Sequence, residues 1–180
     1  MSNLSRVTIA LNKDTSELFE KLKADTRLSQ SELLRNALWF YSKYKDLISI
    51  HGSKKINTYV EMLSEGEHII LDVDHWLLFL KYIETSPKRK NFWEACKAVA
   101  RSHADQLSQK IKSVREFLER IEACNFYKLG ESSENEFVLV LNSDVSKKFV
   151  KTLVQDVLSG MGYKVEIKED FAKLRLRVLQ

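Results

Sequence analysis

The sequence predicts an α+β protein in which a short strand-helix-helix segment, residues 1–46, precedes a larger domain, residues 47–180, of mixed helices and antiparallel strands. Residues 5–11 alternate branched apolar side chains with polar or small ones, which is the period of a strand. Apolar residues then recur at helical spacing up to about residue 45. From about residue 130 onward, strand-like runs flank a single helical pattern.

The two faces of the first predicted strand differ in character. The apolar face consists of Val7, Ile9 and Leu11, and the opposite face of Arg6, Thr8 and Ala10. A lone strand has no partner inside this segment, and its unpaired backbone groups and apolar face would be unstable in isolation. Pairing with the same strand of a second copy gives a two-stranded antiparallel ribbon over a shared core. The sequence therefore predicts a homodimer that is required for folding.

Two helices are predicted after this strand. The first is capped by Asn12 or Asp14 and runs to about Ala24. Ser29 is a suitable cap for the second helix, because Glu32 three residues later completes a Ser-x-x-Glu capping box. The segment is thus a strand, a helix, a tight turn and a second helix.

The larger domain is expected to follow a linker at residues 45–55, which contain His51-Gly52-Ser53. Pro87, the only proline, is expected near the opening of a helix that carries Phe92 and Trp93. The other expected elements are a helix at 54–64, a strand at 68–73, a helix from Asp74 to about Glu84, a strand at 137–141, a helix at 145–158, and strands at 163–167 and 174–179. Gly160 and Gly162 suit the left-handed backbone that ends a helix.

A heptad-like spacing of apolar residues predicts one long helix between about residues 104 and 121. Its members are Ala104, Leu107, Ile111, Val114, Leu118 and Ile121. Such a seam either joins subunits or packs on the rest of its own domain. We favour the second interpretation, because short patterns of this kind are common in bundled helices.

Composition and charge disfavour a membrane-spanning or secreted protein but do not single out one function. The 29 basic and 25 acidic residues give a net charge of +4, which suits nucleic-acid binding without singling it out. The most apolar stretch, residues 69–83, is interrupted by charges and is shorter than the roughly 20 residues that cross a bilayer. With no secretory signal pattern at the N-terminus, we expect a cytoplasmic protein without a membrane span. Cys96 and Cys124 are expected to be reduced.

No motif indicates catalysis or a metal. A Gly-rich phosphate loop, a Gly-x-Ser-x-Gly elbow and a Cys/His pair are all missing from the sequence, so we expect no enzyme activity and no cofactor. The histidines occur singly, which disfavours a metal-sensing site. They are His51, His68, His75 and His103.

A cluster of aromatic residues in the middle of the chain has two interpretations. The residues are Trp76, Phe79, Tyr82, Phe92 and Trp93. They could line an apolar pocket for a small-molecule effector, or they could simply form core.

Three parts of the N-terminal segment together resemble the ribbon-helix-helix, or CopG/Arc/MetJ, family of repressors. They are Arg6-Val-Thr-Ile-Ala-Leu, the helix that carries Leu18, Phe19 and Leu22, and Leu28-Ser-Gln-Ser-Glu-Leu-Leu-Arg-Asn-Ala-Leu. The resemblance covers about a quarter of the chain and implies that the ribbon enters the major groove of double-stranded DNA. Arg6, Thr8 and Ala10 would then read base edges.

The resemblance also implies a phosphate contact at the start of the second helix. Ser29, Gln30 and Ser31 would supply it, since free backbone N–H groups and the helix dipole favour an anion there. Many family members have glycine in the turn between the helices, where this chain has Arg27. With a positive φ angle, Arg27 would carry a strain of roughly 1 kcal/mol, which a contact with the phosphates could offset.

The sequence therefore predicts a DNA-binding transcriptional regulator, specifically a repressor, that acts as a homodimer or a higher oligomer such as a tetramer. The C-terminal domain would sense an effector or assemble dimers. The alternative is a protein-interaction module, such as an antitoxin-like partner protein.

Overall fold

The structure is a computed structural model that describes residues 6–66, 68–130 and 133–179, apart from the side chains of Ile48, Ile50, His51 and Ser53. Parts of three expectations lie outside these residues: the first position of the strand at 5–11, His51 as a ligand, and two residues of the loop near 130. The chain divides into two units, Met1–Ser53 and Lys54–Gln180, and each is described by itself.

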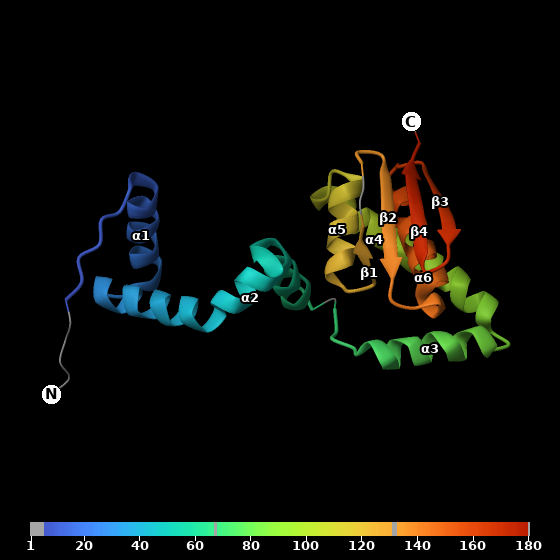
Figure 1. The fold of residues 1–180 in the computed structure, drawn as a ribbon, viewed down its shortest axis with the longest axis horizontal. Coiled ribbons are helices and arrows are strands. Elements are labelled where there is room, and N and C mark those ends of the chain that lie inside the picture. The colour runs from blue at the N-terminus through green and yellow to red at the C-terminus, as the bar shows by residue number, and fades with distance from the viewer. Residues whose placement is uncertain (1–5, 67, 131–132, 180) are drawn as a thin grey trace. The chain divides into compact units, whose positions relative to one another are not determined.

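The chain is α+β, as the sequence predicts (Figure 1). The helices are α1 (Lys13–Thr26), α2 (Gln30–Ser64), α3 (Val73–Thr85), α4 (Arg89–Lys110), α5 (Val114–Ala123), the short 3₁₀ helix η1 (Asp144–Ser146) and α6 (Lys147–Gly160). The strands are β1 (Tyr127–Leu129), β2 (Glu136–Leu141), β3 (Val165–Asp170) and β4 (Lys173–Val178).

The four strands form one antiparallel sheet in the order β1-β2-β4-β3. β2 and β4 are central, and their side chains alternate between buried and more exposed positions. Phe137 pairs with Leu176, and Leu139 with Leu174, so the buried residues of both strands lie on the same face. This alternation, visible in the sequence, is what allows the sheet to cover a core on one side.

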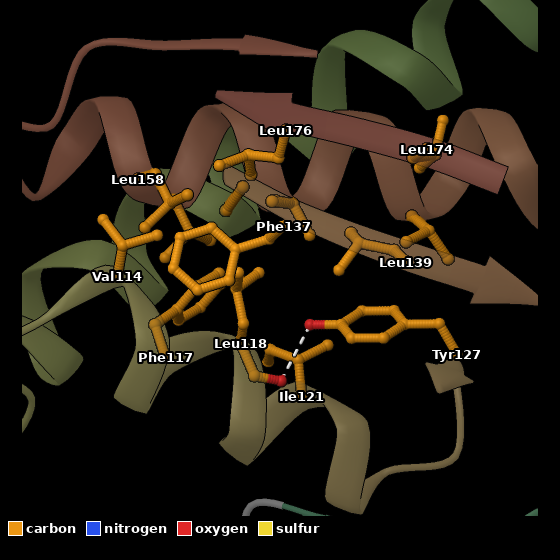
Figure 2. Packing of buried hydrophobic residues seen from close by; sticks show 14 of the residues in the cluster. Val114, Phe117, Leu118, Ile121, Tyr127, Phe137, Leu139, Leu158, Leu174 and Leu176 are labelled. Atoms are coloured by element: carbon orange, nitrogen blue, oxygen red, sulfur yellow. Dashed lines mark hydrogen bonds between the residues drawn. The ribbon is translucent and has the colours of Figure 1, made fainter. Parts of the chain in front are cut away.

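The core lies between this face and the helices α4, α5 and α6 (Figure 2). Phe117 and Leu118 from α5 and Val154 and Leu158 from α6 are completely or almost completely buried. The hydroxyl of buried Tyr127 donates a hydrogen bond of 2.8 Å to the carbonyl of Leu118, which joins β1 to α5. This hydrogen bond offsets the free-energy cost of burying the Tyr127 hydroxyl.

The long helix predicted for residues 104–121 is wrong, because α4 ends at Lys110 and α5 begins at Val114. Ser113 caps α5: its hydroxyl accepts a hydrogen bond of 3.1 Å from the N–H of Glu116. Of the six seam residues, all but half-buried Leu107 are buried, and all six belong to the core of their own unit. The interpretation that the seam packs within its domain is confirmed.

The strand predicted at 68–73 is also wrong. Residues 68–72 form an irregular connection, and Ile69 and Ile70 are 86% and 85% exposed. Without a sheet edge beside it, this apolar run has no strand to pair with. The cap of the next helix is Asp72 rather than Asp74, since the Asp72 carboxylate accepts a hydrogen bond of 3.0 Å from the N–H of His75.

The linker expected at residues 45–55 is helical on both sides of one interruption. Gly52 has φ 71° and ψ 152°, a backbone conformation outside the helical region that glycine adopts without strain. No proline interrupts the segment, so helix can continue on both sides of Gly52.

Gly160 lies where α6 approaches α4 closely, and a methyl group at this position would come within 2.5 Å of the Ala104 Cβ atom. Alanine normally stabilises a helix by about 1 kcal/mol relative to glycine. We expect Gly160→Ala instead to destabilise the protein by about 1–3 kcal/mol through overpacking. Urea unfolding measures the effect. Adding Ala104→Gly should recover most of the loss, and a Gly160→Ala variant more stable than the parent would contradict this packing.

Candidate nucleic-acid interface

Residues 6–12 precede α1 and contain no regular secondary structure in the single chain. Val7, Ile9 and Leu11 are 77%, 54% and 42% exposed, and the residues between them are exposed as well. The predicted strand is therefore absent from an isolated copy. The physical reason is that a strand is defined by backbone hydrogen bonds to a neighbour, and the predicted neighbour belongs to a second copy.

Asn12 fixes the start of α1. Its side-chain oxygen accepts hydrogen bonds from the N–H of Thr15, at 2.9 Å, and from the Thr15 hydroxyl, at 2.7 Å. Of the two caps that the sequence allowed, Asn12 is the one used.

Arg27 forms the turn between α1 and α2. It has φ 57° and ψ 21°, the left-handed conformation, and its N–H donates a hydrogen bond of 3.0 Å to the carbonyl of Lys23. A non-glycine residue in this conformation costs roughly 1 kcal/mol. Arg27 is exposed, so its guanidinium lies at the surface of the turn.

Ser29 and Glu32 form the predicted capping box at the start of α2. The N–H and hydroxyl of Ser29 donate to the Glu32 carboxylate at 3.1 and 2.6 Å, and the Glu32 N–H donates to the Ser29 hydroxyl at 3.3 Å. The hydrogen bonds from the Ser29 side chain and backbone lower the pKa of the Glu32 carboxyl from its ordinary 4.5.

The first turn of α2 presents Gln30 and Ser31 to the surface beside this box. Backbone N–H groups in a first turn lack helical partners, and the helix dipole adds positive potential there. The turn therefore combines these free N–H groups with the exposed Arg27 on one side and the Glu32 carboxylate of the capping box on the other.

The structure places the predicted site residues in two groups. Arg27, Ser29, Gln30 and Ser31 lie together at the turn between α1 and α2, whereas the predicted base-reading residues, 6, 8 and 10, lie on the segment before α1. Among residues 6–53 as described, no hydrogen bond or ion pair joins the two groups.

Apolar side chains at the surface are the main feature of this unit that sequence analysis underestimated. Among the described side chains of residues 6–53, Leu33 alone is buried. Leu38, Trp39, Phe40 and Tyr41 are 61% to 76% exposed on four consecutive positions of α2. The run of three aromatic residues is the sequence signal that could have revealed this surface.

None of the helices in the described part of the chain is long and apolar enough to cross a membrane. Over the same residues, no group of three or more His, Cys, Asp or Glu side chains is arranged to hold a metal ion.

Comparison with known proteins matches residues 5–45 to the family described as "Ribbon-helix-helix protein, copG family". A search of curated proteins finds no match. Among solved structures, the Fe(II) unliganded H-NOX protein from K. algicida is 14% identical with a TM-score of 0.40, covering 78% of this chain and 95% of that chain. A point mutant of that protein is 12% identical with a TM-score of 0.38 and the same coverage. Similarity this weak supports no conclusion on fold or function.

The lowered pKa of Glu32 predicts how the capping box responds to pH. A carboxyl whose pKa is depressed by folding contributes stability above its unfolded pKa and loses it as the pH falls through the folded value, which lies below 4.5. We expect Glu32→Gln to melt at a lower temperature than the parent at neutral pH, and the difference to shrink below pH 4.5. Thermal unfolding of both proteins and an NMR titration of the carboxyl test this. A Glu32 that titrates at or above its ordinary pKa would contradict it.

Proposed function

We propose that this protein is a sequence-specific DNA-binding transcriptional regulator that acts as a homodimer, because residues 5–45 match the ribbon-helix-helix family described as copG. The family match carries the proposal, and the exposed apolar surface of the same residues supports it independently. This role requires access to chromosomal DNA, and we propose a cytoplasmic location.

The surface of the N-terminal unit supports the dimer. Val7, Ile9 and Leu11 are exposed in the single chain, and apolar surface gains roughly 25 cal/mol for each Å² removed from water. Two copies paired antiparallel along these residues would satisfy their backbone groups and bury this face. Since successive side chains of a strand point to opposite faces, Arg6, Thr8 and Ala10 would be left outward.

The outward face of the ribbon has the chemistry to read DNA. Arg6 can donate two hydrogen bonds to guanine, Thr8 offers a hydroxyl and a methyl group, and Ala10 offers only an apolar contact such as a thymine methyl. The α1–α2 turn with Ser29 would hold a phosphate and so fix the register of the ribbon in the groove.

We further propose that the regulator is a repressor and that the C-terminal unit senses an effector or assembles dimers into a tetramer. Two ribbons held together would bind adjacent half-sites with an effective concentration far above that of free dimers. Arg6, Thr8 and Ala10 can distinguish only a few base pairs, so one ribbon has limited sequence specificity. Binding two half-sites at once would increase it.

An alternative function is a protein-interaction module of the antitoxin type, and the aromatic run on α2 favours it. Consecutive helical residues point about 100° apart, so Leu38, Trp39, Phe40 and Tyr41 together surround the helix with apolar surface. One neighbour cannot cover all of these sides. A second partner, either another dimer or a different protein, would account for the remainder.

Base reading predicts the behaviour of Arg6→Ala. The purified protein is first used to select bound genomic fragments, and affinity is then measured on the selected site and on a scrambled one across salt concentrations. We expect Arg6→Ala to lose about 1–3 kcal/mol on the selected site and to discriminate less between the two. Lys164→Ala, an exposed lysine of the C-terminal unit, is the control and should bind as the parent does. Unchanged site selection by Arg6→Ala would count against base reading and favour the alternative function.

The dimer predicts opposite outcomes for two neighbouring substitutions. Ile9→Asp places a charge on the apolar face and should abolish the dimer in sedimentation analysis, because an unpaired buried carboxylate is costly. Thr8→Asp places the same charge on the outward face, so the dimer should persist while DNA affinity falls through repulsion by phosphates. Equal masses for the two variants would contradict the assignment of faces.

A further inference from the structure

Two cavities of the C-terminal unit differ in charge. The larger, of about 1300 Å³, has a mainly apolar lining, and the lysine and the arginine of its described lining are balanced by ion pairs. Lys110 pairs with Glu65, and Arg120 pairs with Glu61 at 3.0 Å. The smaller cavity, of about 430 Å³, lies beside the start of α4 and is lined mainly by charged side chains. Its charges are balanced only in part.

Among the described lining residues of the smaller cavity, four are basic and one, Glu94, is acidic. The basic ones are Arg89, Lys90, Lys97 and Lys148. Lys97 pairs with Glu94 at 3.3 Å, whereas Lys148 pairs at 2.9 Å with Glu84, which lies outside the lining. Arg89, Lys90 and the adjacent Lys88 are exposed, and none of the three forms an ion pair with another described residue. We call these three residues the basic segment.

Glu84 joins three helices beside the basic segment. Its carboxylate accepts hydrogen bonds from Lys148 Nζ at 2.9 Å and from the Trp93 indole N–H at 2.8 Å. Lys148 also lies over the Trp93 ring, 4.3 Å from its centroid. The hydrogen bond from Lys148 is the largest cause of the lowered pKa of Glu84, and the charge of Arg89 is the smallest. Glu84 is thus engaged mainly by Lys148 and Trp93, and it neutralises little of the charge of the basic segment.

The basic segment lies at the end of α4 where cations are least favourable. Lys88 is the N-cap and makes no capping hydrogen bond with its side chain, and the first turn, which begins at Arg89, contains no acidic residue. The helix dipole adds positive potential at this end, so cations there reduce the stability of the helix. The basic segment therefore works against the folding of α4, and an anion bound beside it would reverse the effect.

From these observations we infer that the basic segment, with the small cavity beside it, binds the phosphate backbone of double-stranded DNA without reading its sequence. Duplex DNA carries one negative charge for about every 1.7 Å of its axis, and exposed lysine and arginine side chains are its usual phosphate contacts. The inference rests on the proposed function, since it takes DNA as the polyanion that the protein meets. It adds a second contact, in the C-terminal unit, that is independent of base reading by the ribbon.

The test measures binding of the full-length protein to a fluorescently labelled duplex of scrambled sequence between about 50 and 200 mM salt. We expect the double variant Arg89→Ala, Lys90→Ala to bind at least about tenfold more weakly at the lowest salt. The slope of its log affinity against log salt should be less steep by about 2, since each lost phosphate contact removes about 0.9. The control is Lys164→Ala, Lys173→Ala, two exposed lysines of the same unit without an ion pair among the described residues. The control should behave as the parent does, and equal slopes for the two double variants would overturn the inference.

Charge reversal separates loss of binding from loss of folding. Arg89→Glu, Lys90→Glu places acids where the helix dipole favours them, so this variant should melt at a temperature equal to or above that of the parent while it binds the scrambled duplex less well than the alanine variant does. Lys164→Glu, Lys173→Glu carries the same change in net charge and is the matched control. Equal affinity of the two reversal variants would refute the DNA contact. A lower melting temperature of the Arg89 and Lys90 reversal would show that these cations serve the fold, which also contradicts the inference.

Two further comparisons separate this contact from base reading and from an acidic protein partner. Arg89→Ala, Lys90→Ala should weaken binding to the selected site and to the scrambled duplex by the same factor, whereas Arg6→Ala should reduce the preference between them. A parent without any such preference refutes base reading alone, because the difference between the variants on the scrambled duplex still tests the basic segment. Polyglutamate that competes as strongly as duplex DNA of equal charge concentration would identify an acidic protein as the partner and overturn the inference.

Discussion

The constraint on which the N-terminal unit depends is the exposed apolar face of residues 7–11. This unit has one buried side chain among those described, Leu33, so an isolated copy gains little hydrophobic free energy against the entropy of ordering its backbone. Its local structure is nevertheless well specified, by the Asn12 cap, the left-handed Arg27 and the capping box of Ser29. Hydrogen bonds within the turns can fix which residues begin each helix, but they do not supply a core. We propose that a second copy supplies one, and the same pairing would present the opposite strand face to DNA.

The C-terminal unit, unlike the N-terminal one, forms a hydrophobic core from residues of a single chain. Its sheet, with α4, α5 and α6, buries a continuous apolar core that includes Phe117, Phe137 and Leu158. Near the connection at residues 68–72 this unit leaves Ile69 and Ile70 exposed, and they line its large cavity. The two units therefore differ in how they obtain a core: the C-terminal unit forms its own, whereas we propose that the N-terminal unit obtains one from a second copy of the chain.

The sequence predicted the elements whose signals are local. The Asn12 and Ser29 caps, the helix near 147–160 and the central strands were recognised, because capping side chains and alternation act over a few residues. The apolar heptad spacing continues across the break between α4 and α5 and predicts one helix, whereas Ser113, three residues before Glu116, caps a new one. The strand β1 was missed, since three residues are too few to show alternation. The strand expected at 68–73 does not form for a nonlocal reason, because an apolar run becomes a strand only beside another strand.

The aromatic cluster likewise divides in the structure: Trp76, Phe92 and Trp93 line the large cavity, whereas Phe79 and Tyr82 face solvent.

The pairing of two strands is the claim on which DNA reading, dimer formation and the role of Arg6 all depend. The most direct measurement is an isotope-filtered NOE experiment on a mixture of labelled and unlabelled full-length protein, which detects only contacts between different chains. We predict interchain contacts among Val7, Ile9 and Leu11 in an antiparallel register. A spectrum with no interchain contacts from these residues, in a protein that sediments with the 21.0 kDa mass of one chain, would contradict it.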